Sequence, residues 1–211
     1  MLQNGITGTG TPFWAASFVT FGKDVVIHPY AVVGRVPDHS PALARQPERS
    51  FTLHIGDGVV IGPHAVVYAG STIGAGTLIG DHASIREGCT IGDRCVIGRA
   101  VTLHYDVTLG DEVRLQDRVL ITGGMQIGSG SFIGPGVITS NDRRVDASNY
   151  SFDALLITPP IIGQCVTVGA GANILAGVTV GDGARIAAGA LVCDNVPADG
   201  LVMGQKARLV A

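Results

Sequence analysis

Residues 55–98 read IGDGVVIGPHAVVYAGSTIGAGTLIGDHASIREGCTIGDRCVIG, and an aliphatic residue returns every six positions. The spacing continues without a miss to residue 133, through Ile55, Ile61, Val67, Ile73, Ile79, Ile85, Ile91, Ile97, Leu103, Leu109, Leu115, Ile121, Ile127 and Ile133. A period of six is neither the 3.6 of a helix nor the 2 of a strand. It is typical of a stacked β-solenoid, in which each hexad forms a short strand and a turn. The sequence therefore predicts an all-β fold.

Because these hexads cover most of its length, the chain resembles the hexapeptide-repeat acyltransferase superfamily. The resemblance implies a left-handed parallel β-helix of about seven to eight coils. We expect one domain over residues 1–211, with repeats at 21–34, 55–138 and 162–197, loops at 35–54 and 139–161, and a short C-terminal cap at 198–211. The cap would cover the open edge of the last coil.

Three hexads make one 18-residue coil in that fold, so residues 18 apart stack on one face. The position after each aliphatic residue then forms three columns. Two columns are mostly glycine: Gly56, Gly74, Gly92, Gly110 and Gly128 in the first, and Gly62, Gly80, Gly98, Gln116 and Gly134 in the second. The third column has no glycine and reads Tyr68, Arg86, His104, Thr122 and Ser140. Both loops are predicted to leave from this third face, and long loops in a compact repeat domain are usually functional.

Composition sets outer limits on the function. The net charge of −3 gives no support for binding to nucleic acid or a membrane surface. No apolar run approaches the roughly 18 residues of a membrane span, and no basic segment precedes the short apolar stretch at 13–21. The four cysteines form no close metal-like pair, so we expect reduced thiols in a cytoplasmic protein.

His104 is the best candidate for a general base, because an imidazole titrates near neutral pH. It follows Leu103 where a glycine turn would be expected. A surface imidazole in a polar stripe is the alternative interpretation. His64 and His82 are also 18 residues apart, with Arg118 two coils further on, and we interpret these three as a polar outer ladder.

A metal site is a weaker prediction. Some hexapeptide-repeat proteins are trimeric carbonic anhydrases, which bind zinc through three histidines, two of them close in sequence. Here the histidines lie at 28, 39, 54, 64, 82 and 104, with no pair five residues apart. The sequence therefore predicts no metal.

A more specific resemblance lies in the second loop, where residues 132–144 read FIGPGVITSNDRR. This segment is similar to the Gly-Pro … Thr-Asn-Asp segment of bacterial nucleotide-sugar N-acetyltransferases. Leu115-Gln116-Asp117 is similar to that family's Gln-Asn segment, and residues 204–208, GQKAR, to its ending. Ser140 replaces the family's threonine, Lys206 its proline, and His104 stands where many relatives carry asparagine. These departures leave the acceptor open.

The resemblance implies a homotrimer with active sites between subunits, acetyl-CoA as acyl donor and a UDP- or dTDP-linked sugar as acceptor. It adds Asn141 and Asp142 as catalytic residues to His104, which the glycine-free column indicates. It places Gln116, Asp117 and Ser140 at the substrate, and the glycine-free column with its neighbour adds Arg86, Tyr105 and Thr122. The resemblance places Gly169, Gly177, Ala187, Ala188, Lys206 and Arg208 at the coenzyme, where backbone amides can bind the thioester carbonyl.

Three hypotheses follow. The first, which we favour, is an acetyl-CoA-dependent N-acetyltransferase acting on a nucleotide-linked amino sugar. The second is an O-acyltransferase acting on a sugar or a small hydroxyl compound, with His104 as an obligatory base. The third is a non-catalytic or metal-binding trimer related to carbonic anhydrases.

Overall fold

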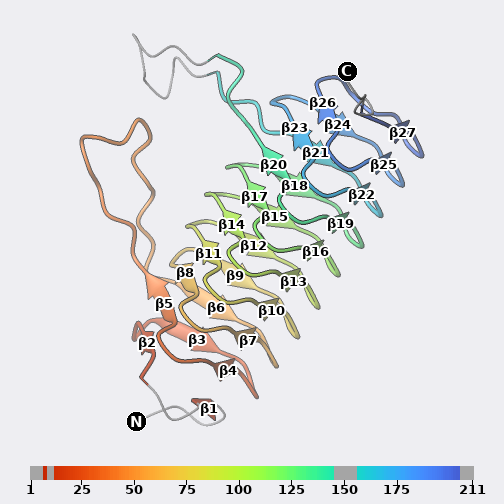
Figure 1. The fold of residues 1–211 in the computed structure, drawn as a ribbon. Helices are drawn as coiled ribbons and strands as arrows, with labels where there is room; N and C mark the ends of the chain where they lie inside the picture. Colours follow the sequence, from red (N-terminus) through yellow and green to blue (C-terminus); the bar gives the residue numbers. More distant parts are fainter. Residues whose placement is uncertain (1–6, 9–11, 145–155, 205–211) are drawn as a thin grey trace, which may run out of the picture.

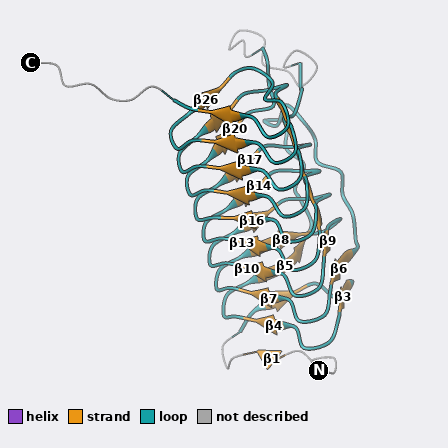
Figure 2. Ribbon diagram, turned by 90° about the vertical axis from the view of Figure 1, so that its right-hand side faces the viewer, coloured by secondary structure: helices purple, strands orange, loops and turns teal. Residues whose placement is uncertain are grey.

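The structure is a computed structural model that describes residues 7–8, 12–144 and 156–204. Its strands, β1 to β27, contain two to four residues each. Among the described residues there is no helix, and hence none long and apolar enough to cross a membrane. Figure 2 shows the strands stacked one above another and joined by turns.

The strands form three parallel sheets, because each strand pairs with the strand one coil earlier and one coil later. Sheet A consists of β1 (Thr7–Gly8), β4 (Val26–Ile27), β7 (Val60–Ile61), β10 (Leu78–Ile79), β13 (Val96–Ile97), β16 (Arg114–Leu115), β19 (Phe132–Ile133), β22 (Thr167–Val168), β25 (Arg185–Ile186) and β27 (Leu201–Val202). Sheet B consists of β2 (Trp14–Ala15), β5 (Val32–Arg35), β8 (Val66–Tyr68), β11 (Ser84–Ile85), β14 (Thr102–Leu103), β17 (Leu120–Ile121), β20 (Ile138–Thr139), β23 (Asn173–Ile174) and β26 (Leu191–Val192). Sheet C consists of β3 (Val19–Phe21), β6 (Leu53–Ile55), β9 (Thr72–Ile73), β12 (Thr90–Ile91), β15 (Thr108–Leu109), β18 (Gln126–Ile127), β21 (Ile161–Ile162) and β24 (Thr179–Val180).

The core is one continuous column inside the three sheets. The hexad aliphatics fill it, and Ile61, Ile79 and Ile97 are fully buried in successive coils of sheet A. Small residues such as Ala65 and Ala83 share the interior, because a narrow coil has no space for larger ones. Each buried aliphatic side chain contributes about 1.5–3 kcal/mol of transfer free energy.

The predicted all-β solenoid is confirmed, and its parallel coils are consistent with the left-handed β-helix. The predicted number of coils, seven to eight, was too low, since sheet A has ten strands and the solenoid about ten turns. The additional strands lie at the two ends. β1 and β2 precede the first recognised hexad, and β27 pairs with β25 from within the segment predicted as the cap. Residues there depart from the hexad pattern yet continue the hydrogen-bonded stack.

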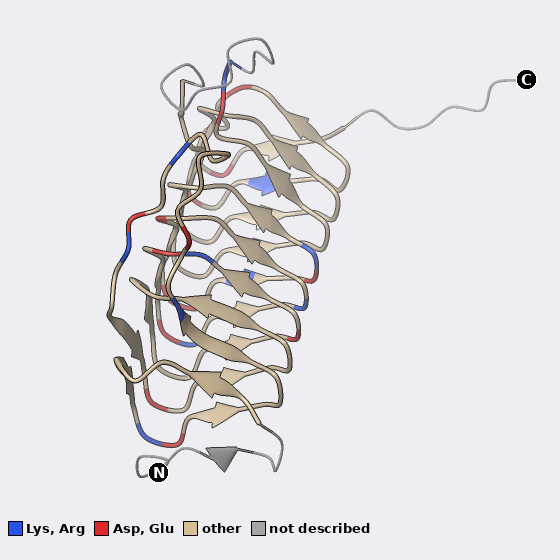
Figure 3. Ribbon diagram, turned by 90° about the vertical axis from the view of Figure 1, so that its left-hand side faces the viewer, with Lys and Arg blue, Asp and Glu red and all other residues tan. Residues whose placement is uncertain are grey.

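The three edges of the solenoid are named here by the sheets that they join. Edge A–B contains the turns from sheet A to sheet B, and edges B–C and C–A are defined in the same way. Both long loops lie on edge B–C, as predicted, because they connect β5 to β6 and β20 to β21. Figure 1 shows these two loops leaving the same side of the stack. Figure 3 shows that charged residues gather in turns and loops, while the strands are mostly uncharged.

Candidate active site

Edge B–C carries the glycine-free column. Parallel pairing aligns Ile85 with Leu103 and Leu103 with Ile121, so the residues that follow them are neighbours along the edge. Thr139 pairs with Ile174, and Ile174 with Val192, which continues the column past the second loop. The complete column is Tyr68, Arg86, His104, Thr122, Ser140, Leu175 and Cys193. The predicted stripe of side chains is therefore present.

A pocket of about 380 Å³ opens on this edge between the two loops. The first loop contributes Leu43, Ala44 and Arg45 to it, and the second contributes Ile157. The remaining lining residues are Arg86, His104, Tyr105, Leu120, Thr122, Thr139, Ser140, Asn141 and Asp142. The pocket thus brings together all three residues predicted to be catalytic and four of those predicted to bind the substrate, and we take it as the candidate active site.

His104 is partly buried in this pocket, and its coil is fixed by a 2.9 Å hydrogen bond from its backbone NH to the carbonyl of Ile121. Burial lowers the pKa of His104 below its ordinary value of 6.5, and the positive charge of Arg86 lowers it further, whereas Glu87 acts in the opposite direction. The neutral imidazole is therefore the predominant form of His104 at pH 7. A neutral imidazole facing a pocket can accept a proton from a bound substrate.

The start of the second loop is held by side chains. The amide nitrogen of Asn141 donates a 2.9 Å hydrogen bond to the carbonyl of Gly123, one coil below. The hydroxyl of Ser140 accepts a 3.2 Å hydrogen bond from the backbone NH of Ala176. Asp142 forms an antiparallel bridge with Ile157, which closes the base of the loop. These bonds fix the Ser140–Asp142 segment beside His104.

Arg45 joins the first loop to the wall of the pocket, which sequence reasoning missed. Its guanidinium donates to the Glu87 carboxylate at 3.0 Å and to the Asp106 carboxylate at 3.1 Å. It also lies over the Tyr105 ring, 3.8 Å from the ring centroid. Glu87 is only 2% exposed and is held by Arg86 as well, at 3.1 and 3.2 Å. Burial raises the pKa of Asp106, although Arg45 opposes this shift.

The thiol of Cys89 lies behind His104 and donates a 3.1 Å hydrogen bond to the carbonyl of His104. Burial raises the pKa of Cys89 to about 12. The group is therefore a thiol, not a thiolate, at neutral pH. Since the thiolate is the nucleophilic form, Cys89 supplies packing here and not covalent catalysis.

We expect Arg45→Ala to release the first loop. Removing one partner of a buried ion pair is costly, so opening of the loop should become at least tenfold more frequent. Limited trypsin digestion would measure this through the rate of cleavage after Arg49. Arg94→Ala is the matched control, because its 3.0 Å pair with Glu112 is exposed and lies on edge C–A. Equal cleavage rates in the two variants would contradict the role assigned to Arg45.

Other predicted site residues lie away from this pocket. Gln116, Asp117, Gly169, Ala187 and Ala188 follow strands of sheet A and lie on edge A–B. Gly177 lies on edge B–C under the second loop, where its NH donates to the carbonyl of Thr158 at 2.8 Å. Lys206 and Arg208 lie outside the described residues. Within one chain, the predicted coenzyme residues therefore fall on two edges.

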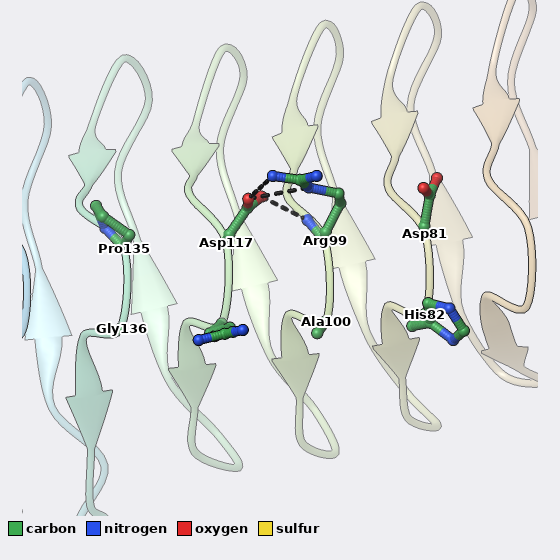
Figure 4. Close-up of a pocket in the computed structure, with 8 residues that line it drawn as sticks. Asp81, His82, Arg99, Ala100, Asp117, Pro135 and Gly136 are labelled. Carbon is green, nitrogen blue, oxygen red and sulfur yellow. Dashed lines mark hydrogen bonds and ion pairs between the residues drawn. The ribbon is translucent and has the colours of Figure 1, made fainter.

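A second groove, of about 760 Å³, lies on edge A–B and is shown in Figure 4. The Asp117 carboxylate accepts hydrogen bonds from Nε and Nη2 of Arg99 at 3.0 and 2.6 Å, and from the Arg99 backbone NH at 2.9 Å. These bonds lower the pKa of Asp117. Among the described residues, no group of three or more His, Cys, Asp or Glu side chains is placed to hold a metal ion.

Comparison with known proteins supports the repeat assignment. The family model "Bacterial transferase hexapeptide (six repeats)" matches residues 53–87, 70–105 and 159–194. A search of curated protein sequences found no match.

Solved structures with similar chains include two acyl-transferring enzymes. A UDP-N-acetylglucosamine acyltransferase from Francisella novicida is 18% identical, with a TM-score of 0.48 over 92% of this chain and 66% of that one. The polySia-specific acetyltransferase NeuO is 17% identical, with a TM-score of 0.43 over 98% and 84%. The chain thus spans about two thirds of the length of the Francisella enzyme.

A third solved structure is PerB from Caulobacter crescentus, in complex with CoA and GDP-perosamine. It is 22% identical, with a TM-score of 0.27 over 84% of this chain and 52% of that one. With TM-scores this low, the fold assignment rests on the hexad period, the strand pairing and the family match. Together these observations establish a solenoid of hexapeptide repeats, and residues 53–105 and 159–194 are the part that matches the bacterial transferase hexapeptide family.

Proposed function

We propose that the protein is an acetyl-CoA-dependent acetyltransferase that N-acetylates an amino sugar linked to a nucleotide, UDP or dTDP, in the cytoplasm. The observation that carries this proposal is the pocket on edge B–C, where a neutral His104 lies beside the Ser140-Asn141-Asp142 segment. That segment is the part of the chain that resembles nucleotide-sugar N-acetyltransferases. The match to transferase hexapeptide repeats supports the same class.

The pocket residues can be given roles in this reaction. Asp142 holds the amino group of the acceptor, and Asn141 positions it. His104 accepts the proton that the nitrogen loses as it attacks the thioester carbonyl carbon. A carbon–nitrogen bond then forms and the carbon–sulfur bond breaks, and the departing CoA sulfur receives the proton from His104. Arg86, Tyr105, Thr122 and Ser140 line the rest of the pocket, so we assign them to the sugar.

The acyl donor is assigned to the coils after the second loop. Small residues there allow close approach to the backbone, since nothing lies within 4 Å of the position that a Cβ would occupy at Gly171 or Gly189. We propose that Gly169, Gly177, Ala187 and Ala188, with Lys206 and Arg208 of the tail, contact acetyl-CoA. Because these residues lie on two edges, a neighbouring subunit would have to supply part of each site.

A homotrimer would meet this requirement. The outward positions of sheet A are largely apolar, with Val60, Leu78, Val96 and Phe132, whereas those of sheet C are Thr72, Thr90, Thr108 and Gln126. A cyclic trimer uses two different surface patches at each subunit contact. Because its outward side chains are largely apolar, sheet A of one subunit would supply one of these patches. Gln116 and Asp117 border sheet A and would then lie near the neighbouring subunit's pocket.

O-acylation is the second candidate function, and the same His104 supports it. A hydroxyl is a weaker nucleophile than a neutral amine and depends more strongly on a base. A buried, neutral imidazole in the pocket is suited to that role.

A thiol-release assay tests both candidates. The chain is incubated with acetyl-CoA and a panel of nucleotide sugars that carry either an amino or a hydroxyl group at the same ring position. Release that depends on an aminated sugar is the expected result, and release with hydroxylated sugars alone would replace N- by O-acylation. The melting temperature of the chain is also measured with acetyl-CoA at about 100 times its Kd. No thiol release, together with no rise in this melting temperature, would reject an acyltransferase. Bound coenzyme at 100 Kd should stabilise by about 2.7 kcal/mol.

A further inference from the structure

Edge A–B keeps side chains at a backbone position that favours glycine. In five successive coils the turn residue with positive φ is not glycine: Tyr30 (62°), His64 (57°), His82 (57°), Ala100 (54°) and Arg118 (60°). On edge B–C the same position is filled by Gly70, Gly88, Asp106 and Gly124, and on edge C–A glycines are interspersed with residues such as Arg94 and Glu112. A non-glycine residue with positive φ carries a conformational cost. Among the described residues, edge A–B has the longest unbroken run of such residues.

The first three of these side chains form a stack. The rings of Tyr30 and His64 are 5.0 Å apart with an interplanar angle of 19°, and those of His64 and His82 are 4.9 Å apart at 4°. The ring spacing therefore equals the spacing between coils. His64, between the other two, shows that a planar ring fits on this edge at one ring per coil.

The stack is interrupted at Ala100. Backbone hydrogen bonds of 2.9 Å, from Ala100 N to Asp81 O and from Arg118 N to Arg99 O, keep the next two coils in register. Ala100 offers only a methyl group, and Arg118 resumes the column one coil later. His82 and Arg118 are thus two coil spacings apart, about 9.6 Å. Figure 4 shows the short Ala100 side chain in line with His82.

This gap forms part of the 760 Å³ groove on edge A–B. Its lining includes His82, Ala100 and Arg118, with Asp81, Arg99 and Asp117 beside them. A planar ring at the level of Ala100 would lie one coil spacing, about 4.8 Å, from the His82 ring, and the backbone of Arg118 lies one coil spacing away on the other side. Both neighbours stack well on aromatic faces, Arg118 through a cation–π contact.

We propose that this gap, formed by His82, Ala100 and Arg118, is a binding slot for the base of an adenine nucleotide. The base occupies the missing position of the stack. The Asp81 carboxylate, next to His82 on the same edge, accepts a hydrogen bond from the exocyclic amino group of adenine. The Arg118 charge favours a ligand that carries phosphate. The slot is separate from the pocket that the same chain forms on edge B–C.

The slot also borders sheet A, where the proposed trimer would have its subunit contact. The experiment therefore uses the full chain in its native assembly. Titration calorimetry with ADP should show saturable binding, and inosine diphosphate, which has a carbonyl in place of the amino group, should bind at least fivefold more weakly.

Ala100→Trp would fill the slot and should weaken ADP binding at least tenfold, and Tyr30 shows that a large ring is tolerated at positive φ. Ala100→Gly leaves the slot open and relieves the backbone, so it should bind as the wild type does. Arg118→Ala removes one stacking partner and should weaken binding roughly ten- to a hundredfold. Absence of ADP binding to the wild type, or equal binding to all variants, would overturn the proposal.

Discussion

Replacing His104 with alanine should lower kcat for acyl transfer by about 100-fold or more, with little change in KM. A positioned general base contributes typically 10²–10⁴ to the rate. The loss should lie near the lower figure for an amine acceptor, whose neutral form attacks without a base, and near the upper figure for a hydroxyl. The thiol-release assay at saturating substrate measures it, and the size of the loss separates the two acceptor chemistries.

The pH profile of acyl transfer provides a second test of His104 as a general base. A general base works only when deprotonated, so activity should fall as the pH falls through the pKa of His104. Burial and Arg86 lower that pKa, which places the acid limb of the profile below pH 6.5. In His104→Ala this limb should disappear.

His54→Ala is the matched control for His104→Ala. His54 lies on β6 with an exposed side chain on sheet C, away from the pocket, and its removal should leave kcat and the pH profile unchanged. A threefold or smaller loss in His104→Ala, with the acid limb intact, would remove His104 from the catalytic role.

Gly92→Ala should destabilise the solenoid by about 3 kcal/mol, at the upper end of the cost of overpacking. A Cβ built at Gly92 would lie 2.6 Å from the carbonyl carbon of Gly110 and 2.7 Å from the backbone nitrogen of Asp111. Backbone atoms of the next coil cannot move aside as a flexible side chain can. For a chain of this size, the melting temperature should fall by roughly 6–12 °C.

Gly58→Ala separates this steric effect from backbone strain. Gly58 has a positive φ of 65° but nothing within 4 Å of its Cβ position. Its substitution should cost only about 1 kcal/mol, the penalty of a left-handed conformation. Differential scanning calorimetry of the two variants compares them directly. A melting temperature of Gly92→Ala equal to that of Gly58→Ala would show that the coils separate more easily than the structure indicates.

The regular part of the fold could be predicted because one rule repeats. The six-residue period fixes which side chains face the core, and the 18-residue coil fixes which turn residues are neighbours. The column containing His104 and Thr122 could therefore be predicted by counting residues along the sequence. The end coils could not be counted in the same way. Their hydrogen bonds are made by the backbone, and sequences such as Thr7–Gly8 and Leu201–Val202 satisfy them without the hexad pattern.

The Arg45 contact could not be predicted for a different reason. Arg45 lies in an aperiodic loop, and its partners, Glu87 and Asp106, are 42 and 61 residues away in sequence. In sequence Glu87 looks like an exposed charge that follows Arg86, but in the structure it is buried and paired with two arginines. No period relates a loop residue to a coil, so this part of the pocket needed the structure.

The placement of the two loops has a consequence for the size of the acceptor. Five strand-to-strand steps of sheet B separate β5 from β20, which corresponds to about 24 Å along the stack. Inserting or deleting one 18-residue coil between them would change this length by about 4.8 Å and leave every other turn in register. The distance between the bases of the two loops can therefore change only in whole coils. Related solenoids could accommodate longer or shorter acceptors by gaining or losing repeats, without remodelling the walls of the pocket.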